Sequence, residues 1–166
     1  LREYALRGGL IISEAAGSNS DFTLDMQKIY GKMFPEYPLT RLASDDPIYT
    51  LSFKSPPAGF SVIRNDLRPL AIHSPKDFSL ALQLGDNREN RPWFERLANL
   101  YLIATDKGQL PPRGVSYWPK AQPFTPVATV RIAPLLLPGL TLPEPMAWDR
   151  LKIYMGNRHR IRLDID

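Results

Sequence analysis

Proline is the residue that most constrains how this chain can fold. Of the 17 prolines in the sequence, nine lie between Pro111 and Pro145. Proline locks its own backbone and lacks the amide hydrogen that helices and central strands need, so this stretch cannot be one continuous helix or strand. We therefore expect an α/β domain over residues 1–106, a Pro-rich linker over residues 107–126 and a strand–helix–strand segment over residues 127–166.

Composition excludes several kinds of function before any motif is considered. The 166 residues are 43% hydrophobic and carry a formal net charge of +4, which is typical of a globular domain and too weakly basic for one that binds nucleic acid. The sequence contains no cysteine, and this excludes disulfides, thiolate nucleophiles and cysteine-bound metals. No apolar run approaches the roughly 18 residues of a membrane-spanning helix. We expect this segment to contact neither nucleic acid nor membrane.

Short apolar runs alternate with helical patterns along the first two thirds of the chain. Residues 10–12 and Pro69–His73 are almost wholly apolar, which is typical of strands buried on both faces of a parallel sheet. Apolar residues at helical spacing predict one helix that ends at Pro35 and another, largely buried, over residues 93–104. Strands that alternate with helices predict a three-layer α/β/α fold of the flavodoxin-like kind, with a mainly parallel sheet.

Several motifs in this part of the chain occur together in one known family. They are Leu1–Tyr4, Arg7–Glu14, Met33–Leu39 and Ser44–Tyr49. On these motifs, residues 1–106 resemble the bacterial domain of unknown function numbered 4159, which implies a fold similar to that of class I glutamine amidotransferases. One position departs from the family pattern, because Asp46 stands where these domains usually carry a histidine before the proline of the turn.

The C-terminal segment carries a weaker form of the same resemblance. Thr125–Ala133 and Pro143–Leu151 look like the opening strand and first helix of another copy of the domain. Two interpretations are open: either a second copy begins here, or the strand at residues 127–133 and its helix complete the sheet of the first domain. We favour completion of that sheet, because an isolated strand and helix would expose their apolar faces to water.

The sequence begins at Leu1, within what looks like the last turns of a helix, so we expect it to be part of a longer bacterial protein. A signal peptide or anchor would lie upstream of this segment. The compartment, cytoplasmic or periplasmic, therefore stays open. The expected partners are other domains of the same longer chain or a separate protein.

Polar residues follow the two predicted core strands, at the edge where ligands bind in open α/β sheets. Ser74 also opens a predicted helix whose free amides would favour an anionic group. The sequence thus predicts that a small anionic ligand binds at this edge. The predicted ligand-binding residues are Glu14, Ser18, His73, Ser74 and Asp77.

No complete catalytic or metal-binding motif accompanies these residues. A glutamine amidotransferase needs a cysteine nucleophile, which this chain lacks, and no Gly-x-Ser-x-Gly elbow is present. Two histidines with scattered carboxylates are too few for a metal site, and the small loop at residues 15–20 matches neither the P-loop nor the dinucleotide fingerprint. We therefore predict no cofactor, metal or catalytic residue.

The leading interpretation is a non-catalytic ligand- or protein-binding module of a larger bacterial protein. The alternative is a cryptic hydrolase in which Glu14, Ser18 and His73 meet at the carboxyl ends of the strands. An enzyme should lose turnover when one of these residues is changed without loss of the fold.

Overall fold

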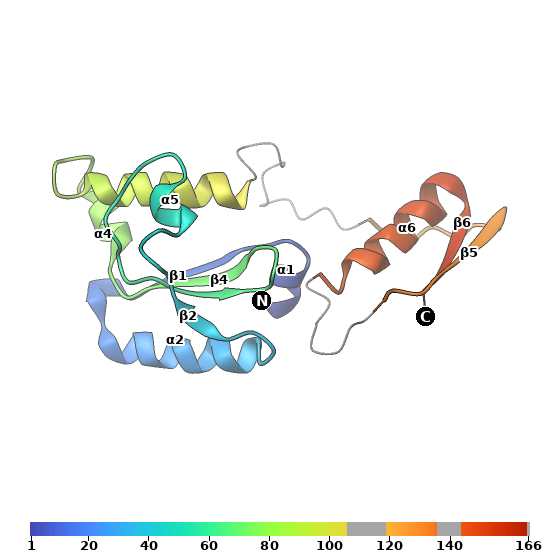
Figure 1. Ribbon diagram of the computed structural model, residues 1–166, viewed down its shortest axis with the longest axis horizontal. Coiled ribbons are helices and arrows are strands. Elements are labelled where there is room, and N and C mark those ends of the chain that lie inside the picture. The colour runs from blue at the N-terminus through green and yellow to red at the C-terminus, as the bar shows by residue number, and fades with distance from the viewer. Residues whose placement is uncertain (106–118, 136–143, 166) are drawn as a thin grey trace. The chain divides into compact units, whose positions relative to one another are not determined.

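A four-stranded sheet with helices packed on it forms the larger part of the computed structural model (Figure 1). The structure describes residues 1–105, 119–135 and 144–165. The chain divides into an N-terminal unit, Leu1–Gly114, and a C-terminal unit, Val115–Asp166. The elements of the N-terminal unit are α1 (Arg2–Leu6), β1 (Ile11–Glu14), η1 (Ala16–Ser18), α2 (Ser20–Met33), β2 (Leu39–Arg41), α3 (Pro47–Thr50), β3 (Ser61–Arg64), β4 (Pro69–Ser74), α4 (Phe78–Gln83) and α5 (Arg91–Ala104).

The sheet of the N-terminal unit is mixed, with strand order β1-β4-β3-β2. β1 and β4 are parallel, whereas β3 is antiparallel to both β4 and β2. The prediction of a mainly parallel sheet is therefore wrong. The reason is the tight turn between β3 and β4, where the side chain of Asn65 accepts hydrogen bonds from the amides of Leu67 and Arg68. So short a connection can join only antiparallel strands, because a parallel pair needs a crossover of a dozen residues or more.

Helices cover both faces of this sheet, and two separate clusters of buried side chains result. Figure 1 shows α2 and α5 on opposite sides of the strands. The cluster on the side of α3 and α5 contains Leu42, Ile48, Tyr49, Phe60, Val62, Ile72 and Leu100. The cluster on the side of α1 and α2 contains Ala5, Tyr30, Phe34, Ile63, Leu70 and Ala71. The strand predicted at Pro69–His73 is confirmed as β4, and all of its residues are buried.

The C-terminal unit has its own two-stranded sheet. β5 (Ala128–Ile132) and β6 (Ile161–Ile165) run parallel, and α6 (Ala147–His159) lies between them in sequence. Among the described residues, β5 pairs with β6 and not with β1 or β4. The prediction that residues 127–133 lie side by side with the first two core strands is therefore wrong, because the helical crossover through α6 supplies β5 with a partner of its own.

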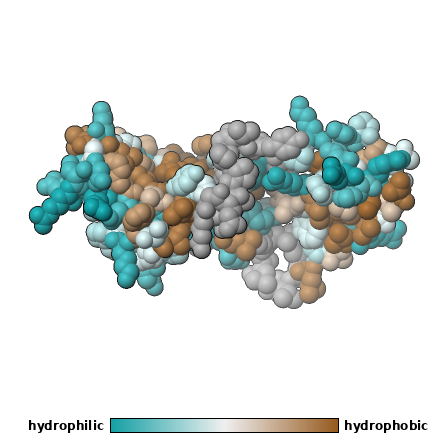
Figure 2. Space-filling model, turned by 90° about the horizontal axis from the view of Figure 1, so that it is seen from above, coloured by the Kyte–Doolittle hydropathy of each residue, from teal (hydrophilic) through white to brown (hydrophobic). Residues whose placement is uncertain are grey.

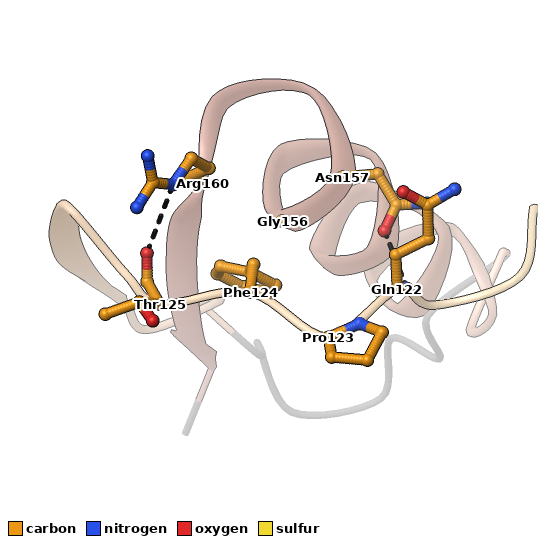
Figure 3. Close-up of a pocket in the computed structure, with 7 residues that line it drawn as sticks. All are labelled: Gln122, Pro123, Phe124, Thr125, Gly156, Asn157 and Arg160. Atoms are coloured by element: carbon orange, nitrogen blue, oxygen red, sulfur yellow. Dashed lines mark hydrogen bonds between the residues drawn. The ribbon is translucent and has the colours of Figure 1, made fainter.

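Residues 119–126, which sequence analysis assigned to the linker, lie against α6 (Figure 3). The side chain of Asn157 donates to the carbonyl oxygen of Lys120 at 2.8 Å and accepts from the amide of Gln122 at 2.9 Å. The ring of Phe124 covers Gly156, where a Cβ atom would lie only 2.5 Å from the ring. Gly156 lies inside α6, and this contact needs a position without a side chain.

None of the helices that the structure describes combines the length and apolarity that crossing a bilayer requires. Apolar residues do reach the surface in both units (Figure 2).

Candidate functional site

A row of polar residues crosses the four-stranded sheet near the carboxyl ends of β1, β4 and β2. Ser13 lies opposite His73, His73 opposite Ser61, and Ser61 opposite Arg41. Side chains directly opposite each other on neighbouring strands point to the same face of a sheet. His73 contacts Thr23 of α2, so this shared face is the one that α2 covers.

A chain of hydrogen bonds joins two side chains of α2 by way of Ser13 and His73, on the face of the sheet that α2 covers. Tyr30 donates its hydroxyl to Ser13 Oγ at 2.8 Å, and Ser13 Oγ lies 2.9 Å from His73 Nδ1. On the other side of the ring, His73 Nε2 lies 3.1 Å from the hydroxyl of Thr23. Burial lowers the pKa of His73 and raises the pKa of Tyr30. Both shifts favour the uncharged forms, so the chain is a neutral polar network.

The predicted site residues Glu14 and Asp77 tie the two strand-end loops together. Glu14 Oε2 accepts from the amides of Phe78 and Ser79 at 2.9 Å each, which satisfies donors at the start of α4. Asp77 is the N-cap of α4 and accepts from Leu80 N at 2.9 Å and from Gly17 N at 2.8 Å. These amide hydrogen bonds lower the pKa of the Asp77 carboxyl. α4 therefore begins three residues later than the start predicted at Ser74.

Of the two predicted site serines, Ser74 is buried and hydrogen-bonded within its loop, whereas Ser18 is exposed to solvent. Ser74 Oγ donates to the carbonyl oxygen of Lys76 at 2.7 Å and accepts from its amide at 3.2 Å, which holds the loop after β4. Ser18 lies exposed on η1 with a φ of +57°. The serine that contacts His73 is Ser13, one that sequence analysis did not select. No local signal selects it, because the strand register decides which residue of β1 lies opposite His73.

A cavity of about 710 Å³ opens beside this row, at the same edge of the sheet. Residues from α2, the end of β2, the loop before β3, the loop after β4 and the start of α5 converge on it. Thr23, Ser61 and Arg41 connect the polar row to the cavity. Its other charged side chains are Lys76, Arg96 and Glu89, and its apolar side chains are Pro57, Ala58, Pro75, Pro92 and Trp93.

Arg96 is the most deeply buried charged residue of the cavity wall, at 6% exposure. Its Nε donates to the carbonyl oxygen of Pro56 at 2.9 Å, and its guanidinium carbon lies 4.3 Å from the centre of the Trp93 ring. Its Nη1 atom is buried and has no hydrogen-bond partner in the part of the chain that the structure describes. Burial lowers the pKa of Arg96, which means that its charge is poorly solvated here. A basic residue on a helix predicted to be largely buried was the sequence signal for this position.

Asp46, at the position where a histidine was expected, has a structural role. Its Oδ1 accepts from the amide of Ile48 at 2.9 Å, which caps α3, and its Oδ2 pairs with Arg64 at 2.7 Å. Aspartate is a preferred N-cap residue because its carboxylate can accept a hydrogen bond from a backbone amide in the first turn of the helix. Within residues 1–105, 119–135 and 144–165, no cluster of three or more metal-ligating side chains is present.

The fold and this edge define an α/β domain with a polar cavity at the carboxyl ends of its strands and no cysteine for amidotransferase chemistry. The family described as "Domain of unknown function (DUF4159)" matches residues 1–110, so the chain belongs to this family and the predicted resemblance is confirmed. Searches of curated proteins and of solved structures found no match. The family carries no assigned function, so function must be argued from the site.

Proposed function

We propose that the N-terminal unit is a non-catalytic binding module whose small-molecule ligand occupies the cavity beside Thr23, Ser61 and Arg41. The observation that carries this proposal is the convergence of five separate segments on one cavity of about 710 Å³. Small-molecule sites have volumes of roughly 300–1,000 Å³ and combine apolar walls with a few polar groups. This cavity has both properties, and it lies at the edge where ligands bind in α/β sheets.

The polar contacts around the cavity favour binding over catalysis. His73 has a hydroxyl on each ring nitrogen, Ser13 on one side and Thr23 on the other, and no carboxylate orients it. Glu14 and Asp77 cap α4 instead of facing a reacting group. In this proposal the five residues predicted as ligand contacts shape the edge of the sheet, and the cavity residues hold the ligand.

An NMR screen with a variant that fills the cavity tests this proposal. A diverse set of small molecules should shift the backbone amides of Thr23, Ser61 and Trp93. Gln27 lines the cavity from an exposed position of α2, so Gln27→Trp should abolish these shifts while the fold is retained. Lys28→Trp, at the next and highly exposed position, is the matched control and should leave them unchanged. Shifts that ignore Gln27→Trp, or that cluster in the C-terminal unit, would overturn the proposal.

One observation favours the hydrolase alternative: Ser13 Oγ lies 2.9 Å from His73 Nδ1, as a nucleophile does from its base. However, Tyr30 already donates to the same oxygen, and an acid to orient the histidine is missing from its contacts. A fluorophosphonate probe separates the two functions. A hydrolase would be labelled at Ser13 and would lose the label in Ser13→Ala, whereas the binding module stays unlabelled.

A further inference from the structure

We infer that the ligand of this cavity is an organic anion, a carboxylate or phosphate group joined to an apolar body. This inference rests on the proposed binding function and adds the chemical class of the ligand. It is drawn from three features of the cavity wall: its unbalanced charge, the incomplete hydrogen bonding of Arg96 and the apolar residues on the remaining surface.

The charge of the cavity wall is positive and unpaired. Of the residues that the structure describes, Arg41, Lys76 and Arg96 line the cavity together with one carboxylate, that of Glu89. Elsewhere in this unit basic residues form ion pairs, as Arg64 does with Asp46 and Arg91 with Glu95. Among the described residues, none of the three cavity cations has a carboxylate within ion-pair distance. Three positive groups that converge without counter-ions provide a site for an anion.

The guanidinium group of Arg96 also has too few hydrogen-bond partners for a buried charge. A buried charge is costly unless it is paired and hydrogen-bonded. Arg96 is 94% buried, yet its contacts are one carbonyl oxygen and the face of the Trp93 ring, and Nη1 has no partner. Glu95 acts on Arg96 only at longer range and is itself paired with Arg91, so an anion in the cavity would supply a directly bonded counter-charge.

The remaining wall requires a ligand larger than a bare anion. Pro57, Ala58, Pro75, Pro92 and Trp93 give the cavity an apolar side. Gly59 also lines the cavity; its φ of +74° suits glycine, and a Cβ there would be in ordinary van der Waals contact with Arg41 Nη2 at 3.5 Å and Pro75 Cγ at 3.7 Å. The cavity volume far exceeds that of a phosphate or carboxylate group. An apolar body beside the acidic group would fill it and bury the proline and tryptophan surfaces.

The inference is tested with three probes of graded chemistry: phenyl phosphate, inorganic phosphate and benzyl alcohol. Trp93 reports on the cavity by fluorescence once Trp118 and Trp148 are replaced by phenylalanine, and amide shifts locate the binding. Phenyl phosphate should bind about tenfold or more tightly than either of the other probes, because it alone satisfies both the cations and the apolar side. Its affinity should fall as salt is added, since exposed charges are screened.

Charge-removing variants show which groups hold the anion. Arg41→Met and Lys76→Gln change exposed residues that the fold does not need, and each should weaken phenyl phosphate binding about three- to tenfold. Lys32→Gln removes an exposed charge from the far end of α2 and should have no effect. Arg96→Lys keeps the charge but loses the planar donors, so it should weaken binding while the salt dependence persists.

Each contrary result has a different meaning. If benzyl alcohol and phenyl phosphate shift the cavity amides with equal affinity, the ligand is not an anion, although the binding function stands. If Arg41→Met and Lys76→Gln behave like Lys32→Gln, the assigned cations do not hold the ligand, and the inference is overturned. If none of the probes shifts Thr23, Ser61 or Trp93 up to the solubility limit, both the inference and the proposed function are overturned.

Discussion

The strands β4 and β5 both carry branched apolar residues and both have a parallel neighbour, but their surroundings differ. β4 has a strand on each side and helices on each face, and all of its residues are buried. β5 pairs with β6 alone, and every residue except the last is exposed. An apolar run therefore predicts a strand in both units, whereas its burial depends on the neighbours that the rest of the chain provides.

The largest contrast is expected for core truncation. Leu100 of α5 is 2% exposed, so Leu100→Ala should lower the free energy of unfolding by about 2–5 kcal/mol through lost burial and a residual cavity. Val130→Ala in β5, where the side chain is 43% exposed, should cost less than about 0.5 kcal/mol. Denaturant titrations of single-tryptophan variants, which keep either Trp93 or Trp148, report on the two units separately. A cost below about 1 kcal/mol for Leu100→Ala would mean that α5 is not part of the core.

A second comparison uses two asparagines that clamp backbone groups. Asn99 is fully buried; it accepts from the amides of Ser52 and Phe53 and donates to the carbonyl oxygens of Ile48 and Phe53. Asn99→Ala should cost about 2–4 kcal/mol, because it leaves buried polar groups without partners. Thermal and urea unfolding measure this cost. A loss no larger than that of an exposed asparagine such as Asn87 would show that water replaces the lost contacts.

In the C-terminal unit the corresponding clamp is Asn157, which is more accessible to water. Its removal should cost only about 1 kcal/mol, since the freed groups of Lys120 and Gln122 can bind water. Hydrogen exchange at the Gln122 amide should accelerate in Asn157→Ala, while exchange in β4 stays unchanged. If exchange at Gln122 does not accelerate, residues 119–126 are held on α6 by Phe124 rather than by this side chain.

The smallest effect is expected from the titration of His73. Burial lowers the pKa of His73 in the folded state below its unfolded value of 6.5, so the unfolded chain binds the proton first as the pH falls. The stability of the N-terminal unit should therefore be complete above pH 6.5 and decrease as the pH drops below it. Unfolding measured between pH 7 and 5 tests this, and His73→Gln should remove the pH dependence in that interval. An unchanged slope in His73→Gln would assign it to another group.

Much of the N-terminal unit could be predicted because its signals are local. The apolar runs at β1 and β4, the helical spacing of α2 and the apolar helix α5 all show in short windows of sequence. β2 and β3 were missed, since they are short and lie within or beside Pro-rich connections. The antiparallel hairpin of β3 and β4 depends on Asn65 bonding to its own turn, and this hairpin is what made the sheet mixed.

The cavity lies at the edge of the sheet where the ligand-binding residues were predicted, but other residues line it. Glu14, Ser74 and Asp77 were predicted to contact a ligand, and in the structure their hydrogen bonds shape loops and cap α4. Arg41 and Arg96, more than fifty residues apart in sequence, line the cavity together. No short window of sequence pairs these two residues, because the folded chain alone brings them to one place.

By itself, the sequence determined the absence of thiol chemistry, since no cysteine is present, and the interruption of regular structure wherever proline removes a donor. Only the tertiary structure decided that Ser13, His73, Ser61 and Arg41 form one row and that three cations border one cavity. The physical reason is that residue type acts on the backbone within a few positions. Strand register, by contrast, is a property of paired segments and sets which distant side chains share a face.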